Sequence, residues 1–138
     1  MLITTQLKKL VRLVEKKAAN HLKKTDVSVG YTSYLMNLYQ KAGITQTSLQ
    51  QAVGFEHPTV VRALDRMARD GLIERRANPN DRRSYLIFLT DKARSHQEIV
   101  MQAAEKLNCH LVKGLTRKQC IELAKYLELM TNNLDTRE

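Results

Sequence analysis

The chain has 138 residues, which is enough for one domain with a modest core. Twenty-three Lys and Arg side chains stand against fourteen Asp and Glu, so the net charge is +9. This balance favours polyanionic partners such as nucleic acid, although many basic proteins use their charge only for solubility. No apolar run is long enough for a transmembrane helix, and we do not expect the charged N-terminus to be a signal peptide.

The sequence contains no recognisable catalytic or metal-binding motif. The five glycines fall at helix ends and turns, and the four histidines show no HxxxH or HExxH spacing. Two cysteines, Cys109 and Cys120, fall on helical patterns, so we expect reduced thiols in the cytoplasm. Both fit packing as small apolar side chains, and Cys120, close behind two cations, is the better candidate for an oxidant-sensing thiol. We expect no enzyme, no metal and no cofactor.

Apolar spacing predicts a mainly α chain with six helices and one small β-hairpin. The helices are expected over residues 2–24, 31–41, 47–53, 58–70, 91–113 and 117–130. The strands are expected over residues 72–77 and 85–89, on either side of a polar turn. Thr90 is expected to cap the fifth helix, and the pairs Thr47 with Gln50 and Thr116 with Gln119 fit capping boxes.

The middle of the chain has the order of elements of a winged helix-turn-helix. A short helix, a turn with Gly54 and a second helix occupy residues 45–70, and the hairpin over residues 72–90 follows as the wing. Val60, Leu64 and Met67 form the inward stripe of the second helix. The opposite face carries residues that suit the major groove of DNA: His57, Pro58, Thr59, Arg62 and Arg66. A solvated surface helix is the alternative interpretation of that face.

Three charged residues lie at the expected tip of the wing: Asp81, Arg82 and Arg83. A narrow minor groove attracts an inserted Arg because its potential is strongly negative. Asp81 stands two residues before Arg83, close enough to hold that guanidinium in one orientation. An ordinary polar turn with a weak surface ion pair is the alternative. The position of this turn directly after a helix-turn-helix favours the DNA contact over that alternative.

These segments resemble the MarR family of winged-helix regulators. The match runs through residues 49–93, and its most specific parts are LDRMARDGLIER and the wing pattern of Asp81, Arg83, Leu89 and Thr90. The stretch GFEHPTVVRALDRM, with DRR in the wing, looks most like the SlyA branch. The resemblance implies that Arg83 enters the minor groove, that Asp81 positions it, and that the second helix reads the major groove. It also implies near-palindromic promoter sites and release by small phenolic or aromatic acids.

The resemblance further implies an obligate homodimer in which the first helix and the last two helices interlock. The residues agree, because apolar stripes at both ends lack an evident partner within the chain. We therefore expect dimerisation helices over residues 1–30 and 91–138, and a DNA-binding lobe over residues 31–90. An implied effector pocket between these parts would lie near several residues, none of which we assign to a ligand: Arg12, His21, Tyr31, Tyr34, Met36 and Tyr39.

Positive charge is concentrated outside the expected DNA-binding lobe. Residues 1–43 have a net charge of +6, residues 44–90 of +2 and residues 91–138 of +1. Four interpretations of the basic N-terminal region stay open: contact with flanking phosphates, steering of DNA, attraction of an anionic ligand, and a solvated helix face. Its apolar stripe lacks Trp and Phe, so we expect no membrane binding.

Together these features predict a cytoplasmic, dimeric transcription regulator that binds a palindromic promoter site on duplex DNA. Repression by occlusion of a promoter fits, and the resemblance to SlyA-like proteins also implies activation by displacement of a silencing protein. Equal affinity for random and palindromic DNA would instead indicate a non-specific architectural nucleic-acid-binding protein. Retained dimerisation without any duplex binding would indicate a redox or ligand sensor that acts through a protein partner.

Overall fold

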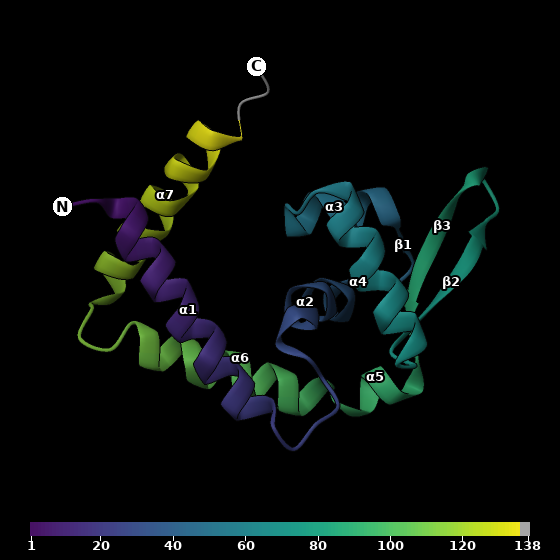
Figure 1. Cartoon of the computed structure of the whole chain (residues 1–138), viewed down its shortest axis with the longest axis horizontal. Helices are drawn as coiled ribbons and strands as arrows, with labels where there is room; N and C mark the ends of the chain where they lie inside the picture. Colours follow the sequence, from purple (N-terminus) through teal and green to yellow (C-terminus); the bar gives the residue numbers. More distant parts are fainter. Residues whose placement is uncertain (136–138) are drawn as a thin grey trace.

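The computed structural model describes residues 1–135, which form a helical chain with one small sheet (Figure 1). Its α-helices are α1 (Ile3–Leu22), α2 (Thr32–Gln40), α3 (Gln46–Val53), α4 (His57–Arg69), α5 (Asp91–Ser95), α6 (Gln97–Leu111) and α7 (Arg117–Leu134), with a short 3-10 turn η1 (Val29–Tyr31) before α2. The strands β1 (Ile44–Thr45), β2 (Ile73–Asn78) and β3 (Asp81–Leu89) form an antiparallel sheet in the order β1-β3-β2. The expected class, mainly α with a small hairpin, is confirmed.

The described chain has one α-helix more than the sequence predicted. The helix expected over residues 91–113 is divided at His96, which ends α5 and precedes α6 with φ −90° and ψ −5°. Just before it, the Ser95 hydroxyl donates to the carbonyl of Lys92 at 2.6 Å, a local bond of the kind that bends helices. Strand β1 was not predicted, since a strand of two residues is too short to show alternation.

A single core holds α2, α3, α4 and the sheet together. Leu35, Leu49 and Leu64 have no exposed surface, and the predicted inward stripe of Val60, Leu64 and Met67 is confirmed as fully buried. Burying a side chain of this size contributes about 1.5–3 kcal/mol. The stripe therefore fixes which face of α4 remains in solvent.

Local signals set the angle between α3 and α4. Gly54 has φ +74° in the turn between them, a conformation that costs other residues but not glycine, and its amide donates to the carbonyl of Gln50 at 2.9 Å. The expected capping box of Thr47 and Gln50 is wrong, because the helix begins earlier and Thr45 caps it by accepting from the amide of Ser48 at 3.1 Å. The capping box of Thr116 and the Thr90 cap are confirmed.

The elements gather at two ends of the molecule (Figure 1). The helices α3 and α4 and the β2–β3 hairpin form one end, while α1, α7 and both ends of the described chain lie at the other. Helix α1 packs along α6, but no residue of α7 is buried within residues 1–135. In the same described residues, no helix is long and apolar enough to cross a membrane.

Candidate nucleic-acid interface

Helix α4 presents all five residues that the sequence predicted for the major groove. It begins at His57, and Pro58 fits its first turn because the backbone N–H that proline lacks has no helical acceptor there. The ring nitrogen Nδ1 of His57 lies 3.1 Å from Oε1 of Gln50, which links the start of α4 to α3. Three further predicted residues, Thr59, Arg62 and Arg66, are exposed along the same helix, as are His57 and Pro58.

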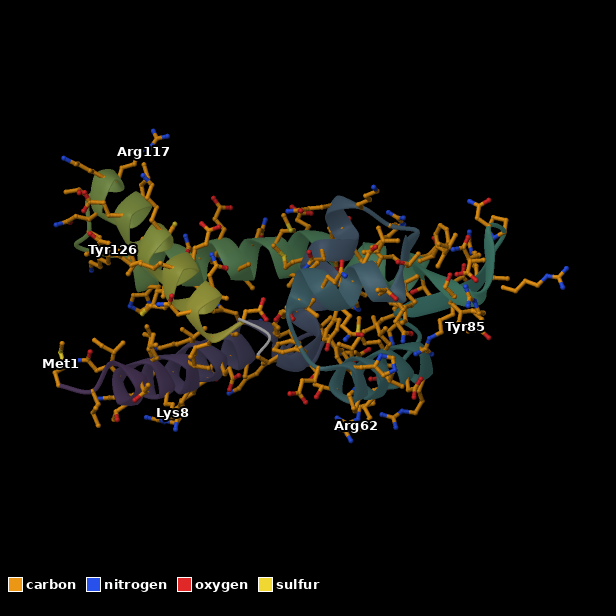
Figure 2. The ribbon with its side chains drawn as sticks, turned by 90° about the horizontal axis from the view of Figure 1, so that it is seen from above. Met1, Lys8, Arg62, Tyr85, Arg117 and Tyr126 are labelled. Carbon is orange, nitrogen blue, oxygen red and sulfur yellow. The ribbon has the colours of Figure 1, made fainter. Side chains whose placement is uncertain are left out.

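Ion pairing leaves two arginines of α4 unoccupied. Arg75 on β2 forms an ion pair with Asp65, with Nη2 of Arg75 2.8 Å from Oδ1 of Asp65. Arg69 forms an ion pair with Asp70 at 3.6 Å. Among the described residues, Arg62 and Arg66 form no ion pair. Figure 2 shows Arg62 pointing outward from α4. Asp65 and Asp70 are therefore engaged by Arg75 and Arg69, and within residues 1–135 the guanidinium groups of Arg62 and Arg66 are free to meet phosphates or base edges.

The tip of the wing is held in shape by its own polar side chains. The amide of Asn80 donates to Oδ1 of Asn78 at 3.0 Å, and Nδ2 of Asn78 donates to the Ser84 hydroxyl at 2.9 Å. Asp81 accepts from the amide of Arg83 at 2.9 Å and from its Nε at 3.4 Å. The Arg83 side chain is nevertheless 92% exposed. The expected proximity of Asp81 and Arg83 is thus present, and their roles on DNA stay a prediction.

The aromatic ring of Phe88 packs at the base of the wing, close to both Arg76 and Gly43. The guanidinium carbon of Arg76 lies 4.0 Å above the centre of the Phe88 ring, and Arg76 also pairs with Glu74. Gly43 has φ +77°, and a Cβ there would lie 3.0 Å from the same ring, so both the backbone conformation and the close approach favour glycine. Tyr85, labelled on the wing in Figure 2, is more than half exposed and was not predicted as a site residue. Alternation along β3 places it on the same face as Arg83, a signal that the sequence did contain.

Comparison with known proteins relates this geometry to a known family. Residues 28–85 match the model of the MarR family. A MarR transcriptional regulator from Methanosarcina mazei Go1 is 27% identical over 95% of this chain and 94% of its own, with a TM-score of 0.81. A mutant of E. coli MarR, complexed with operator DNA, is 26% identical over 91% and 93%, with a TM-score of 0.77. The chain thus has the winged-helix fold of these regulators, and residues 28–85 resemble the MarR family.

The expected likeness to the SlyA branch is confirmed at the level of the fold. A SlyA-like transcription regulator from Listeria monocytogenes superposes with a TM-score of 0.86 at 22% identity, covering 97% of this chain and 89% of its own. The winged helix-turn-helix predicted from the sequence is therefore confirmed as well. The MarR family consists of transcription regulators, so the expectation that this protein is not an enzyme is also confirmed.

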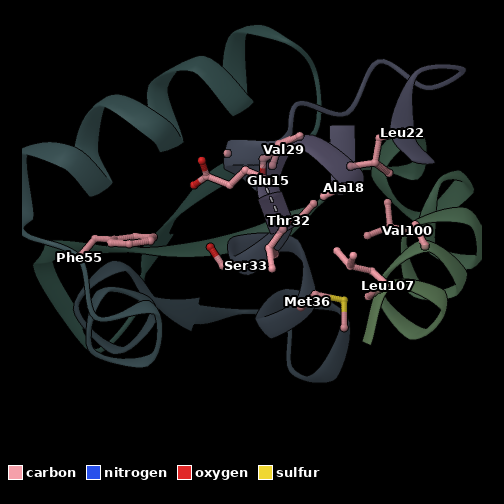
Figure 3. A pocket seen from close by; sticks show the side chains of 14 residues that line it. Glu15, Ala18, Leu22, Val29, Thr32, Ser33, Met36, Phe55, Val100 and Leu107 are labelled. Atoms are coloured by element: carbon pink, nitrogen blue, oxygen red, sulfur yellow. Dashed lines mark hydrogen bonds between the residues drawn. The ribbon is translucent and has the colours of Figure 1, made fainter. Parts of the chain in front are cut away.

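The protein has a cavity of about 520 Å³ between α1, α2 and α6 (Figure 3). Most of its lining is apolar, and the polar side chains are Glu15, Thr32 and Ser33. Of the six residues that the sequence placed near a pocket, Met36 alone lines this cavity. Two of the others, Tyr31 and Tyr34, belong to the core, where burial raises the pKa of each hydroxyl.

The two cysteines are free thiols in different surroundings. Cys109 on α6 is exposed, and Cys120 near the start of α7 is half-buried. No group of three or more metal-ligating side chains occurs within residues 1–135. An oxidant-sensing role for Cys109 or Cys120 therefore stays a prediction from the sequence.

Proposed function

We propose that this protein is a homodimeric MarR-type transcription regulator that binds a near-palindromic promoter site on duplex DNA. The observation that carries the proposal is the pair of unengaged cations on α4, Arg62 and Arg66, beside a wing that presents Arg83 almost fully to solvent. A helix of this kind fits the major groove, and a slim turn fits the minor groove. We further propose that the N-terminal end of α4 contacts the DNA through His57, Pro58 and Thr59.

A homodimer is supported by the apolar surface of α7. Six large apolar side chains of this helix are at least 40% exposed: Ile121, Leu123, Tyr126, Leu127, Leu129 and Leu134. A monomer rarely exposes so many large apolar side chains on one helix, because covering apolar surface releases about 25 cal/mol for each Å². A second copy of the chain is the proposed cover, with residues 1–30 and 91–138 forming the dimerisation part and residues 31–90 the DNA-binding lobe. Twofold symmetry would then set two α4 helices about one turn of DNA, roughly 34–36 Å, apart.

A small-molecule effector is a second element of the proposal, and the cavity of about 520 Å³ favours it. An aromatic ring fits the apolar lining, and Thr32 and Ser33 offer hydroxyls for one polar group. The lining contributes a carboxylate, Glu15, and no Lys, Arg or His. A neutral aromatic compound therefore fits the lining of one protomer better than the phenolic or aromatic acid that the family resemblance implies.

Selection of bound sequences from a random duplex pool, at about physiological salt, tests the proposal. An enriched inverted repeat with half-sites one helical turn apart is the expected result. The double substitution Arg62→Ala with Arg66→Ala should lose the enriched sequence while the protein stays dimeric. Retained binding without enrichment would replace the proposal with non-specific nucleic-acid binding. Absence of duplex binding by a folded dimer would favour a sensor that acts through a protein partner.

A further inference from the structure

Helix α1 carries a stripe of positive charge that the helix-turn-helix and wing do not use. Lys8, Lys9, Arg12 and Lys16 are exposed, and at about 100° per residue they fall within an arc of about 100° on the helix surface. We call these four residues the basic stripe. Lys8, Arg12 and Lys16 follow at steps of four, so like charges are direct neighbours along the helix. Such spacing destabilises an isolated helix because the like charges repel one another. Binding an anionic partner would reduce this repulsion.

The basic stripe has no partner within the described chain. Five basic side chains elsewhere in residues 1–135 form ion pairs with carboxylates: Arg69, Arg75, Arg76, Arg83 and Lys92. None of the four side chains of the stripe does so in the same part of the chain. Glu15 is the one acidic residue of α1, and it lines the cavity. The positive charge of the basic stripe is therefore not compensated by carboxylates on the surface of α1.

The basic stripe lies on the side of α1 opposite to the side that packs against α6. The apolar residues Ile3, Leu7, Leu10 and Val14 are centred about 180° from it around the helix. Leu7 and Val14 are half-buried, and α1 packs along α6, so this apolar side faces the protein. The basic stripe therefore lies on the opposite side of α1, where neither packing against α6 nor a partner helix on the apolar side would cover it.

Figure 2 relates the stripe to the DNA-binding lobe. Lys8 and Arg62 point toward the same edge of the molecule in this view, although they lie at different ends of it. Arg117, at the start of α7, points toward the opposite edge. A rigid polyanion lying against the outward side of α4 would thus extend on the side of the molecule that the basic stripe faces.

We propose that the basic stripe of α1 binds phosphates of the same duplex whose bases α4 contacts, in the segment between the two half-sites. This inference rests on the proposed function and assigns a second, sequence-independent contact surface to it. Lys8 to Lys16 spans about 12 Å of helix, and a duplex carries one negative charge for about every 1.7 Å of its axis, so several phosphates fall within reach. Contacts of this kind add affinity and salt dependence and leave sequence preference unchanged.

The test compares the salt dependence of DNA binding for the wild type and the triple variant Lys8→Gln, Arg12→Gln, Lys16→Gln. The negative slope of log K against log salt should become shallower by roughly 2 to 5, which is about 0.9 for each phosphate that the variant dimer no longer neutralises. The sequence enriched from a random pool should not change. A matched variant, Lys113→Gln, Arg117→Gln, Lys118→Gln, removes the same charge from the α6–α7 turn and should keep the wild-type slope.

Three outcomes would overturn the inference without touching the proposed function. The stripe variant could keep the wild-type slope on the selected site, the two triple variants could change the slope equally, or vesicles with anionic lipid could bind the wild type through the stripe while DNA binding is unaffected by it. Failure of the wild type to bind any duplex would instead contradict the proposed function itself. Circular dichroism and sedimentation confirm that both variants are folded and have the wild-type oligomeric state.

Discussion

One carboxylate oxygen of Asp81 accepts two hydrogen bonds from Arg83, one from its backbone amide at 2.9 Å and one from its Nε at 3.4 Å. The first bond shapes the turn, and the second restrains the direction of the guanidinium. Within residues 1–135, neither terminal nitrogen of Arg83 makes a hydrogen bond or ion pair, so both can bind another group. The carboxylate thus orients the cation without neutralising its outer face, which is the arrangement that a groove-inserting arginine requires.

Arg83→Ala should weaken binding to the selected DNA site by about 1–3 kcal/mol, because it removes the proposed minor-groove contact. Asp81→Ala should weaken it by less, since the guanidinium remains but loses its restraint. Titration of labelled duplex at fixed salt measures both. Arg82→Ala, which removes the same charge from the adjacent position, is the control and should have only the smaller effect of removing one phosphate interaction. Equal losses of affinity for Arg82→Ala and Arg83→Ala would mean that the wing acts only as a diffuse charge.

Arg62→Ala should relax the base preference at one position of each half-site and reduce affinity for the selected sequence by about 1–3 kcal/mol. Affinity for random duplex should fall much less. Arg69→Ala is the matched control on the same helix, because Arg69 pairs with Asp70 at 3.6 Å and is not one of the unengaged cations. A parallel decrease in affinity for selected and random duplex would assign Arg62 to a phosphate instead of a base.

Strong local signals made most of the fold predictable. The stripe of Val60, Leu64 and Met67 gave the buried face of α4, and therefore also its exposed face. Gly54 and Pro58 marked the turn between α3 and α4 because each fits a backbone geometry that few other residues tolerate. The capping pair of Thr116 and Gln119 was identified because both of its hydrogen bonds are local in sequence.

Features that depend on distant residues were beyond the sequence. Thr45 and Thr47 both offer a hydroxyl near the start of α3, and the cap is Thr45, the one that also pairs with Leu86 in the sheet. Likewise, the ion pair of Arg75 with Asp65 joins residues that sequence spacing does not connect, yet it determines which arginines of α4 stay free. The division of the helix at His96 was also not predicted, because no Gly or Pro marks it in the sequence.

Leu127→Glu should convert the proposed dimer to a monomer or weaken its association strongly. Leu127 is 42% exposed on α7, on the same side as Leu123 and Tyr126, and in the dimer its substitution would place an unpaired charge in an apolar interface. Sedimentation velocity at several protein concentrations measures the change. Lys125→Glu introduces the same charged side chain at an exposed position of the same helix and is the control. A wild-type chain that sediments as a monomer at every concentration would remove the dimer from the proposal.

Tyr31→Phe and Tyr34→Phe should change the free energy of unfolding in opposite directions. The Tyr31 hydroxyl donates to Oδ2 of Asp70 at 2.8 Å, and losing a bond to a charged acceptor costs about 1.5–3 kcal/mol. The Tyr34 hydroxyl is buried and has no hydrogen-bond partner among the described residues, so its removal should stabilise the protein by about 1 kcal/mol. Urea unfolding at one fixed protein concentration measures both, since a dimer's apparent stability depends on concentration. Destabilisation of equal size in both variants would mean that the Tyr34 hydroxyl finds a partner in solution.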